Sequence, residues 1–518
     1  MKTRILSLAL VFAFVLSFTA FMPVSAENAE RITLSALINM GNTMTYDPDD
    51  MPSFQRFYEE TNIKVEWEVV RSGWDDRKNM QFASGDIPDM LFGNRTIRMP
   101  DIMSNLDVFM KLNDYLLDAP NIQRMYAEEP SLMKLSMLPD GSIYSLPHRM
   151  PLRPDTFDGQ YINKTWLDEL GLDIPETSED LYEVLKAFKE RDPNGNDEAD
   201  EIPYSFQGTG TMFGTYWIFG MFGIADNIWG ERIEIRDGEL LYIATDDGFK
   251  EGLKYMRRLY REGLLDPECF TQDWSQWQSK CQSTDPMVIG TAGMWTQTAL
   301  FGNAAAPNFV TLPPLKGPNG DQRWRANYVN LRSDPCTWAM SAACSDPEAA
   351  IRFIDHIYNP ANSVQLYFGS YGEGIELLSD GQIEIKPTPE GMSSYDDFIW
   401  HVGFGDMGPY YISRDFEKNI IPNRWVLDKG EINDVYLPFC PKPEEVFPTM
   451  NYELDTANEI AIIRTDLDNI INEKMAAWVT DQADIDEEWD SYLSQLDQVG
   501  LPRLMEIYNE AYENYKAS

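Results

Sequence analysis

Residues 192–201 carry oxygen-bearing side chains at the alternating spacing that suits a hard cation. Calcium takes six to eight oxygen ligands at about 2.3–2.6 Å, and a tight loop turns the side chains at its positions 1, 3 and 5 inward. The predicted ligands are, in chain order, Asp192, Asn194, Asn196, the backbone carbonyl of Glu198, Asp200 and Glu201. We therefore expect a structural calcium ion in this loop.

This loop departs from the standard EF-hand pattern at two positions. Glycine falls at position 4 (Gly195) instead of position 6, and position 12 is Pro203 instead of glutamate. The loop is therefore not expected to act as a calcium switch that opens a pair of helices. An Asx-rich turn without an ion is the alternative.

Aromatic side chains provide the second set of candidate binding residues. Phe, Trp and Tyr make up 13% of the chain. A sugar ring has an apolar C–H face and a rim of hydroxyls, so its site needs flat aromatic surface beside planar polar groups. The predicted sugar contacts are Asn94, Arg149, Trp274, Trp277, Trp295, Trp324, Tyr328 and Trp400. A neutral sugar and a uronate both remain open, because Arg95, Arg149, Arg153, Arg323 and Arg325 could meet uronate carboxylates.

The elements that must position these residues alternate between strands and helices. Strands are predicted at residues 32–38, 63–69 and 90–92, and helices at 51–60 and after Asp75. This alternation predicts a parallel α/β sheet, whose ligands lie beyond the carboxyl ends of the strands, so Asn94 falls at the rim. A second α/β unit contains an amphipathic helix at 181–188, with Thr177 as its N-cap.

The amino terminus has the pattern of an export signal. Lys2 and Arg4 precede an apolar run, and Val24-Ser25-Ala26 offers a cleavage site, so residues 1–26 are predicted to be a signal peptide. No cysteine lies just after this site, so no lipobox anchor is expected. The mature protein is expected in the periplasm or at the extracellular surface.

Charge and cysteine content exclude several classes of protein. The formal net charge of −42 repels nucleic acid and anionic lipid headgroups. The odd count of 5 cysteines argues against a disulfide framework, although Cys336 and Cys344 could pair in an oxidising compartment. A monomer is expected.

Enzymatic function remains as one alternative. The 3 histidines lack metal-ligand spacing, and neither a nucleophile elbow nor a phosphate loop is present. A glycoside hydrolase or polysaccharide lyase stays open, because two carboxylates are enough for glycoside hydrolysis.

Several stretches in this order resemble the extracellular solute-binding proteins of ABC sugar importers, and specifically the subgroup of calcium-containing alginate-binding periplasmic proteins. They are residues 83–89 (ASGDIPD), 166–172 (WLDELGL), 192–203, 263–268 (GLLDPE), 293–295 (GMW) and 511–512. The resemblance implies a non-catalytic protein that binds an oligosaccharide and presents it to the membrane subunits of an ABC transporter.

The resemblance also implies the fold, an α/β periplasmic-binding-protein-like fold of type II with two discontinuous lobes joined by a hinge. On this basis the amino-terminal lobe comprises residues 27–150 and 312–360. The carboxy-terminal lobe comprises residues 151–311 and 361–518, and includes the calcium loop. The chain is expected to cross between the lobes near residues 144–148 and to return near 310–314.

Overall fold

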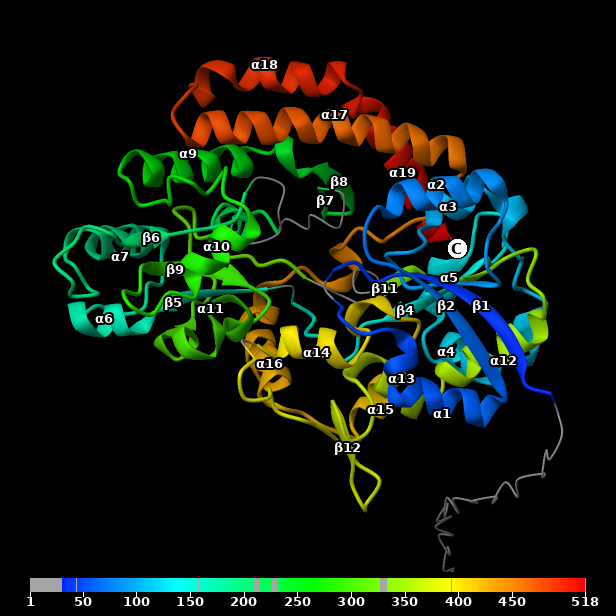
Figure 1. Ribbon diagram of the computed structural model, residues 1–518. Coiled ribbons are helices and arrows are strands. Elements are labelled where there is room, and N and C mark those ends of the chain that lie inside the picture. Colours follow the sequence, from blue (N-terminus) through cyan, green and yellow to red (C-terminus); the bar gives the residue numbers. More distant parts are fainter. Residues whose placement is uncertain are drawn as a thin grey trace, which may run out of the picture.

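The computed structural model describes residues 30–42, 44–156, 158–208, 215–225, 232–326, 333–392 and 394–517. Two large sheets, each with its own buried core, form two lobes that lie side by side in Figure 1. The predicted signal peptide, residues 1–26, and Tyr328 lie outside the described residues.

The first lobe is built on a five-stranded sheet. Its strands, in spatial order, are β2 (Ile63–Val70), β1 (Ile32–Asn39), β3 (Met90–Phe92), β11 (Ser333–Met340) and β4 (Ser145–Arg149). Strand β1 pairs in parallel with β2 and β3, which confirms the predicted strands and their direction. Strand β11 runs antiparallel to β3 and β4, because it enters this sheet from the other lobe.

Helices cover both faces of this sheet. Along β1, Ala36 and Ile38 belong to one buried cluster and Leu37 to another, as the twofold alternation of a strand requires. The helices of this lobe are α1 (Pro52–Thr61), α2 (Trp74–Ser84), α3 (Met99–Met103), α4 (Pro120–Glu128), α5 (Pro130–Ser136), α12 (Pro347–Ile357), α13 (Pro360–Phe368), α14 (Tyr395–Val402) and α15 (Arg414–Glu417).

The second lobe is built on a four-stranded sheet. Its strands, in spatial order, are β10 (Phe309–Thr311), β5 (Gly159–Asn163), β9 (Ile289–Met294) and β6 (Ile202–Tyr204). Its helices are α6 (Lys164–Leu170), α7 (Ser178–Glu190), α8 (Tyr216–Gly220), α9 (Asp247–Arg261), α10 (Trp274–Cys281), α11 (Gln297–Ala305), α17 (Leu454–Val479), α18 (Ile485–Gln498) and α19 (Leu501–Ala517). Helix α7 begins with a capping box between Thr177 and Asp180, which confirms the predicted start of this helix.

Two small sheets complete the fold. One contains β12 (Ile375–Leu377), β13 (Ile383–Ile385) and β14 (Ile420–Ile421), and the other contains β7 (Ile233–Arg236) and β8 (Glu239–Tyr242). All five cysteines are free thiols, so Cys336 and Cys344 are not paired. Within the described part of the chain, no helix has both the length and the apolar character of a bilayer span.

Along the described chain, three segments cross between the lobes. The first runs from β4 to β5 and the second from β10 to β11. The third is helix α16 (Arg424–Tyr436): Trp425 packs in the core of the first lobe, whereas Ile432 and Tyr436 pack in the core of the second.

This third crossing changes the predicted division of the chain. The sequence-based division places residues 361–518 in the second lobe, but Val364, Phe398 and Trp425 pack in the core of the first lobe. The sequence patterns marked two crossings only, because a crossing inside a helix carries no turn or linker signal. We propose that the first lobe extends to about residue 425.

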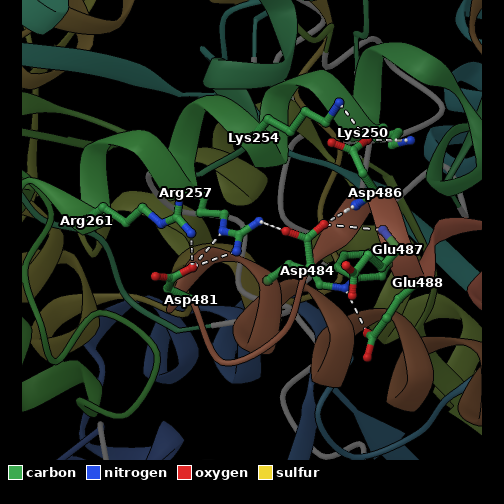
Figure 2. A network of polar contacts seen from close by, with 10 residues as sticks. Lys250, Lys254, Arg257, Arg261, Asp481, Asp484, Asp486, Glu487 and Glu488 are labelled. Atoms are coloured by element: carbon green, nitrogen blue, oxygen red, sulfur yellow. Dashed lines mark hydrogen bonds and ion pairs between the residues drawn. The ribbon is translucent and has the colours of Figure 1, made fainter.

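Helix α17 lies across the top of both lobes in Figure 1 and contacts α9 of the second lobe and α3 of the first. An ion-pair network joins the turn after α17 and the start of α18 to α9 (Figure 2). The pairs are Lys250–Asp486 (2.9 Å), Lys254–Asp486 (2.8 Å), Arg257–Asp481 (2.6 Å), Arg257–Asp484 (3.1 Å) and Arg261–Asp481 (2.6 Å). The four cations share one face of α9, because helical residues three or four apart are neighbours.

This network predicts the effect of Arg257→Met. Losing the two partners of Arg257 should speed amide hydrogen exchange around the α17–α18 turn. Arg258→Met is the matched control, because Arg258 pairs with Glu179 of α7 instead.

The same network depends on pH. The hydrogen bonds from Arg261 and Arg257 lower the pKa of Asp481 to about 2. The network is therefore intact above the ordinary Asp pKa and is lost as the pH falls toward 2. Equal rates of amide exchange around the α17–α18 turn in Arg257→Met and Arg258→Met would contradict the proposed role of this network.

Candidate functional site

The carboxyl edge of the first sheet holds the predicted loop after β3. The Asn94 backbone N–H donates to the Met407 carbonyl (3.1 Å), and its side-chain amide donates to the Asp406 carbonyl (3.0 Å). The Arg95 guanidinium lies 5.0 Å from the ring centre of Trp400 on α14. This loop is therefore anchored to residues more than 300 positions away, at the edge where ligands are expected.

The second lobe meets this edge through α11. Trp295 directly follows β9, and the Thr296 side chain caps the start of α11. Helix α11 contacts α14, and the side-chain amide of Asn303 donates to the Met392 carbonyl (3.3 Å). Trp295 is partly buried against the core of the second lobe, and Trp400 against that of the first. These two predicted aromatic contacts thus come from elements on opposite sides of the junction between the lobes.

Charged side chains lie where the chain crosses at this junction. Arg153, in the first crossing, binds both carboxylate oxygens of Asp406 (2.8 and 2.6 Å). Burial alone would raise the pKa of Asp406, but the charge of Arg153 outweighs it, and this pKa lies below its usual value. On the second-lobe side, the buried Arg325 binds both oxygens of Asp158 (3.0 and 2.5 Å).

Lys429 of α16 is close enough to Arg153 and Asp406 to feel both charges. Its side chain is 2% exposed, and its ammonium lies 3.0 Å from the ring centre of Trp425, one helical turn before it. Burial lowers the pKa of Lys429 well below its ordinary value; the charge of Arg153 lowers it further, whereas Asp396 and Asp406 oppose the shift.

Three predicted sugar contacts belong to the interior instead. Arg149 is 1% exposed, and its guanidinium binds the Ile412 carbonyl (2.6 Å) and Glu417 (3.0 Å). Trp277 is fully buried on the inner face of α10, and Trp324 stacks on Tyr436 at 3.9 Å. Trp274 is half-buried and packs edge-on against Trp277. Composition alone does not distinguish such core aromatics from binding aromatics.

Trp425, Lys429 and Asp406 are the residues at this junction that the sequence pattern missed. The four-residue spacing of Trp425 and Lys429 on a helix is a usable signal, since it brings an ammonium over an aromatic ring. Asp406 carries no such local signal, because its partner Arg153 is distant in the sequence.

The predicted calcium loop closes on itself through its own side chains. Asp192 accepts the backbone N–H groups of Gly195 (3.0 Å) and Asp197 (3.0 Å). The amides of Asn194 and Asn196 both reach the carboxylate of Asp200, at 2.8 and 3.0 Å. The alternating side chains of this loop therefore converge.

The donor set fits a cation at this point. Oxygen Oε1 of Glu201 is buried without a hydrogen-bond partner. Burial raises the pKa of Glu201, and repulsion from Asp192 and Asp200 raises it further. Within the described residues, no three His, Cys, Asp or Glu side chains form a metal site, so a cation held in this loop would also need the amide oxygens of its asparagines. Rotation of each amide by half a turn exchanges its nitrogen for oxygen.

A cavity of about 570 Å³ lies elsewhere, between α5, the segment before α17, and α19. None of the predicted sugar contacts lines it. It is therefore not the predicted sugar site.

Residues 45–364 match the model of the bacterial extracellular solute-binding protein family. The chain belongs to this family. It is 30% identical, over 94% of its own length and 91% of the relative's, to the fructooligosaccharide ABC transporter substrate-binding protein FusA of Streptococcus pneumoniae. The structure of FusA in complex with kestose has a TM-score of 0.84 at 28% identity, covering 94% of this chain and 99% of that one.

Two further structures share the fold. A FusA structure described as an EF-hand mutant, in complex with fructo-nystose, has the same TM-score of 0.84, identity of 28% and coverage of 94% and 99%. The alginate-binding protein AlgQ2, solved without calcium ion, shares the fold with a TM-score of 0.70 at 21% identity, covering 94% of this chain and 99% of that one. The two-lobe fold predicted from the sequence is confirmed.

The buried pair at the second crossing yields a prediction for stability. Arg325→Met should lower the free energy of unfolding by about 3–5 kcal/mol, because it leaves the carboxylate of Asp158 buried without its cation. The double variant Arg325→Met, Asp158→Leu should lose less, because apolar groups of similar size replace both charges. Urea denaturation measures both values. A single variant within about 1 kcal/mol of the wild type would show that the pair is not structurally important.

Proposed function

We propose that this protein captures an oligosaccharide outside the cytoplasmic membrane and delivers it to the membrane subunits of an ABC importer. Its membership of the solute-binding family carries this proposal, together with the oligosaccharide ligands in the names of its relatives. The position of Trp295 and Trp400 on elements that meet between the lobes supports it.

The proposed mechanism is hinge closure. A ligand shifts the balance between an open and a closed form only by contacts that one form has and the other lacks. A sugar held between Trp295 of the second lobe and Trp400 of the first would supply such contacts. The closed shape would then be the form that the importer recognises.

The protein is a binding protein, not an enzyme, as its relative FusA is a substrate-binding protein. The alternative of a glycoside hydrolase or lyase is therefore set aside. We propose that it acts as a monomer and, since its family is extracellular, that the mature chain follows residue 26.

We also propose that residues 192–201 hold a structural calcium ion. The supports are the convergence of Asp192, Asn194, Asn196 and Asp200, the buried oxygen of Glu201, and the EF-hand in the name of a FusA structure. Calcium would neutralise the crowded carboxylates of this loop and fix the end of α7, which stops just before it.

Trp295→Ala should weaken oligosaccharide binding while leaving the fold intact. Loss of one stacked ring costs about 1–3 kcal/mol, which is roughly a 5- to 150-fold increase in Kd. Isothermal titration measures the affinity, and chromatography of the recovered glycan checks that it is not cleaved. Trp277→Ala is the core control, which should instead lose about 3–5 kcal/mol of stability. Wild-type affinity in a folded Trp295→Ala protein would contradict the proposed site.

Chelation of calcium should lower Tm. An ion that binds only the folded form adds about 2.7 kcal/mol at a concentration a hundredfold above its Kd. The double variant Asp192→Ala, Asp200→Ala should melt at one temperature with or without chelator. The double variant Asp197→Ala, Glu198→Ala is the matched control, because it also removes two negative charges from the loop. Neither of these side chains is a predicted calcium ligand, so chelator should still lower the Tm of this variant. A wild-type Tm that chelation leaves unchanged would count against the ion.

A further inference from the structure

Four arginines described in or beside the crossings between the lobes are paired with carboxylates of the same chain. Arg149 pairs with Glu417 (3.0 Å) and Arg153 with Asp406 (2.6 Å). Arg325 pairs with Asp158 (2.5 Å), and Arg323 pairs with Glu234. Four of the five arginines that could have met a uronate therefore have an internal partner.

Within the described residues, Arg414 also has an internal partner in this region, Asp155 (3.3 Å). Two further cations described here are Arg95 and Lys429. The Arg95 guanidinium lies over Trp400, and burial lowers its pKa. The Lys429 amine is covered by protein and lies against Trp425, so it presents no charge to a ligand. Two further carboxylates are described in this region: Asp396 accepts from the Trp425 indole (2.8 Å), and Asp334 accepts from the Cys336 backbone (2.8 Å). The charge of Asp396 acts on Lys429, and the charge of Arg98 acts on Asp334.

This balance determines which ligand charge the junction tolerates. A bound uronate would need a cation for each carboxylate that it buries, since an unmatched buried charge is costly. If the uronate took Arg153 as its cation, Asp406 would lose its own partner. Replacing one ion pair by another in this way brings no net gain in binding free energy. A neutral sugar makes no such demand, because aromatic faces and carboxylate or amide acceptors suit its C–H faces and hydroxyls.

We propose that the site selects uncharged oligosaccharides and discriminates against oligouronates, through the internal pairing of its arginines. This inference rests on the proposed function and deepens it. The overall charge of −42 acts in the same direction by slowing the approach of polyanions.

The test compares pairs of ligands that differ only in charge. Neutral and uronate oligosaccharides of equal length are titrated into the wild-type protein by calorimetry. Each neutral ligand that binds is oxidised at its primary hydroxyls to give its uronate form, and each uronate that binds is methyl-esterified. The uncharged member of each pair should bind at least tenfold more tightly, with little change in its Kd as the salt concentration rises.

Each outcome has one meaning. Equal or tighter binding of the charged member would overturn the selectivity and leave the proposed function standing. If no oligosaccharide of either class binds, the proposed function fails and the selectivity fails with it. Asp406→Asn provides a second measurement, because it releases Arg153: in a folded variant, the preference for the uncharged member should shrink by at least tenfold. An unchanged preference would refute the role of this pairing.

Discussion

The three crossings between the lobes are joined to one another at Tyr436, and the rest of the account depends on this junction. The Tyr436 hydroxyl accepts from the Gln160 backbone N–H (3.0 Å) and donates to the Leu312 carbonyl (2.6 Å), so it links the first and second crossings from the third. Its ring stacks on Trp324, whose indole N–H donates to the Asp158 carbonyl (3.2 Å). Because all these groups are buried, separating them would leave polar atoms unpaired in the interior.

This junction determines where the molecule can bend. On the second-lobe side the crossings form a single bonded unit, and on the first-lobe side Arg149 and Arg153 fix the first crossing to Glu417 and Asp406. In the proposed closure the lobes would therefore rotate as rigid bodies, with the change in backbone angles confined to short stretches between the two sets of contacts. Helix α16 spans these stretches and carries Lys429 at its middle, between one core and the other.

Local signals in the sequence were sufficient for local structure. The alternating apolar residues of β1 and β2, the Thr177 cap and the spacing of oxygens in residues 192–201 each depend on neighbours in the chain. Contacts between distant residues were not accessible in the same way. Arg149, Trp277 and Trp324 have the residue types of a sugar site, yet long-range packing buries them, and the crossing inside α16 has no linker composition. Trp295 and Trp400 remain at the junction of the lobes, where their role as sugar contacts stays a prediction.

Small-angle X-ray scattering, with and without a saturating oligosaccharide, tests the central claim of two rigid lobes that close around a ligand. The bound protein should have a smaller radius of gyration, and rigid rotation of the lobes about the crossings should reproduce the difference. An unchanged scattering curve under conditions where calorimetry shows saturation would contradict hinge closure.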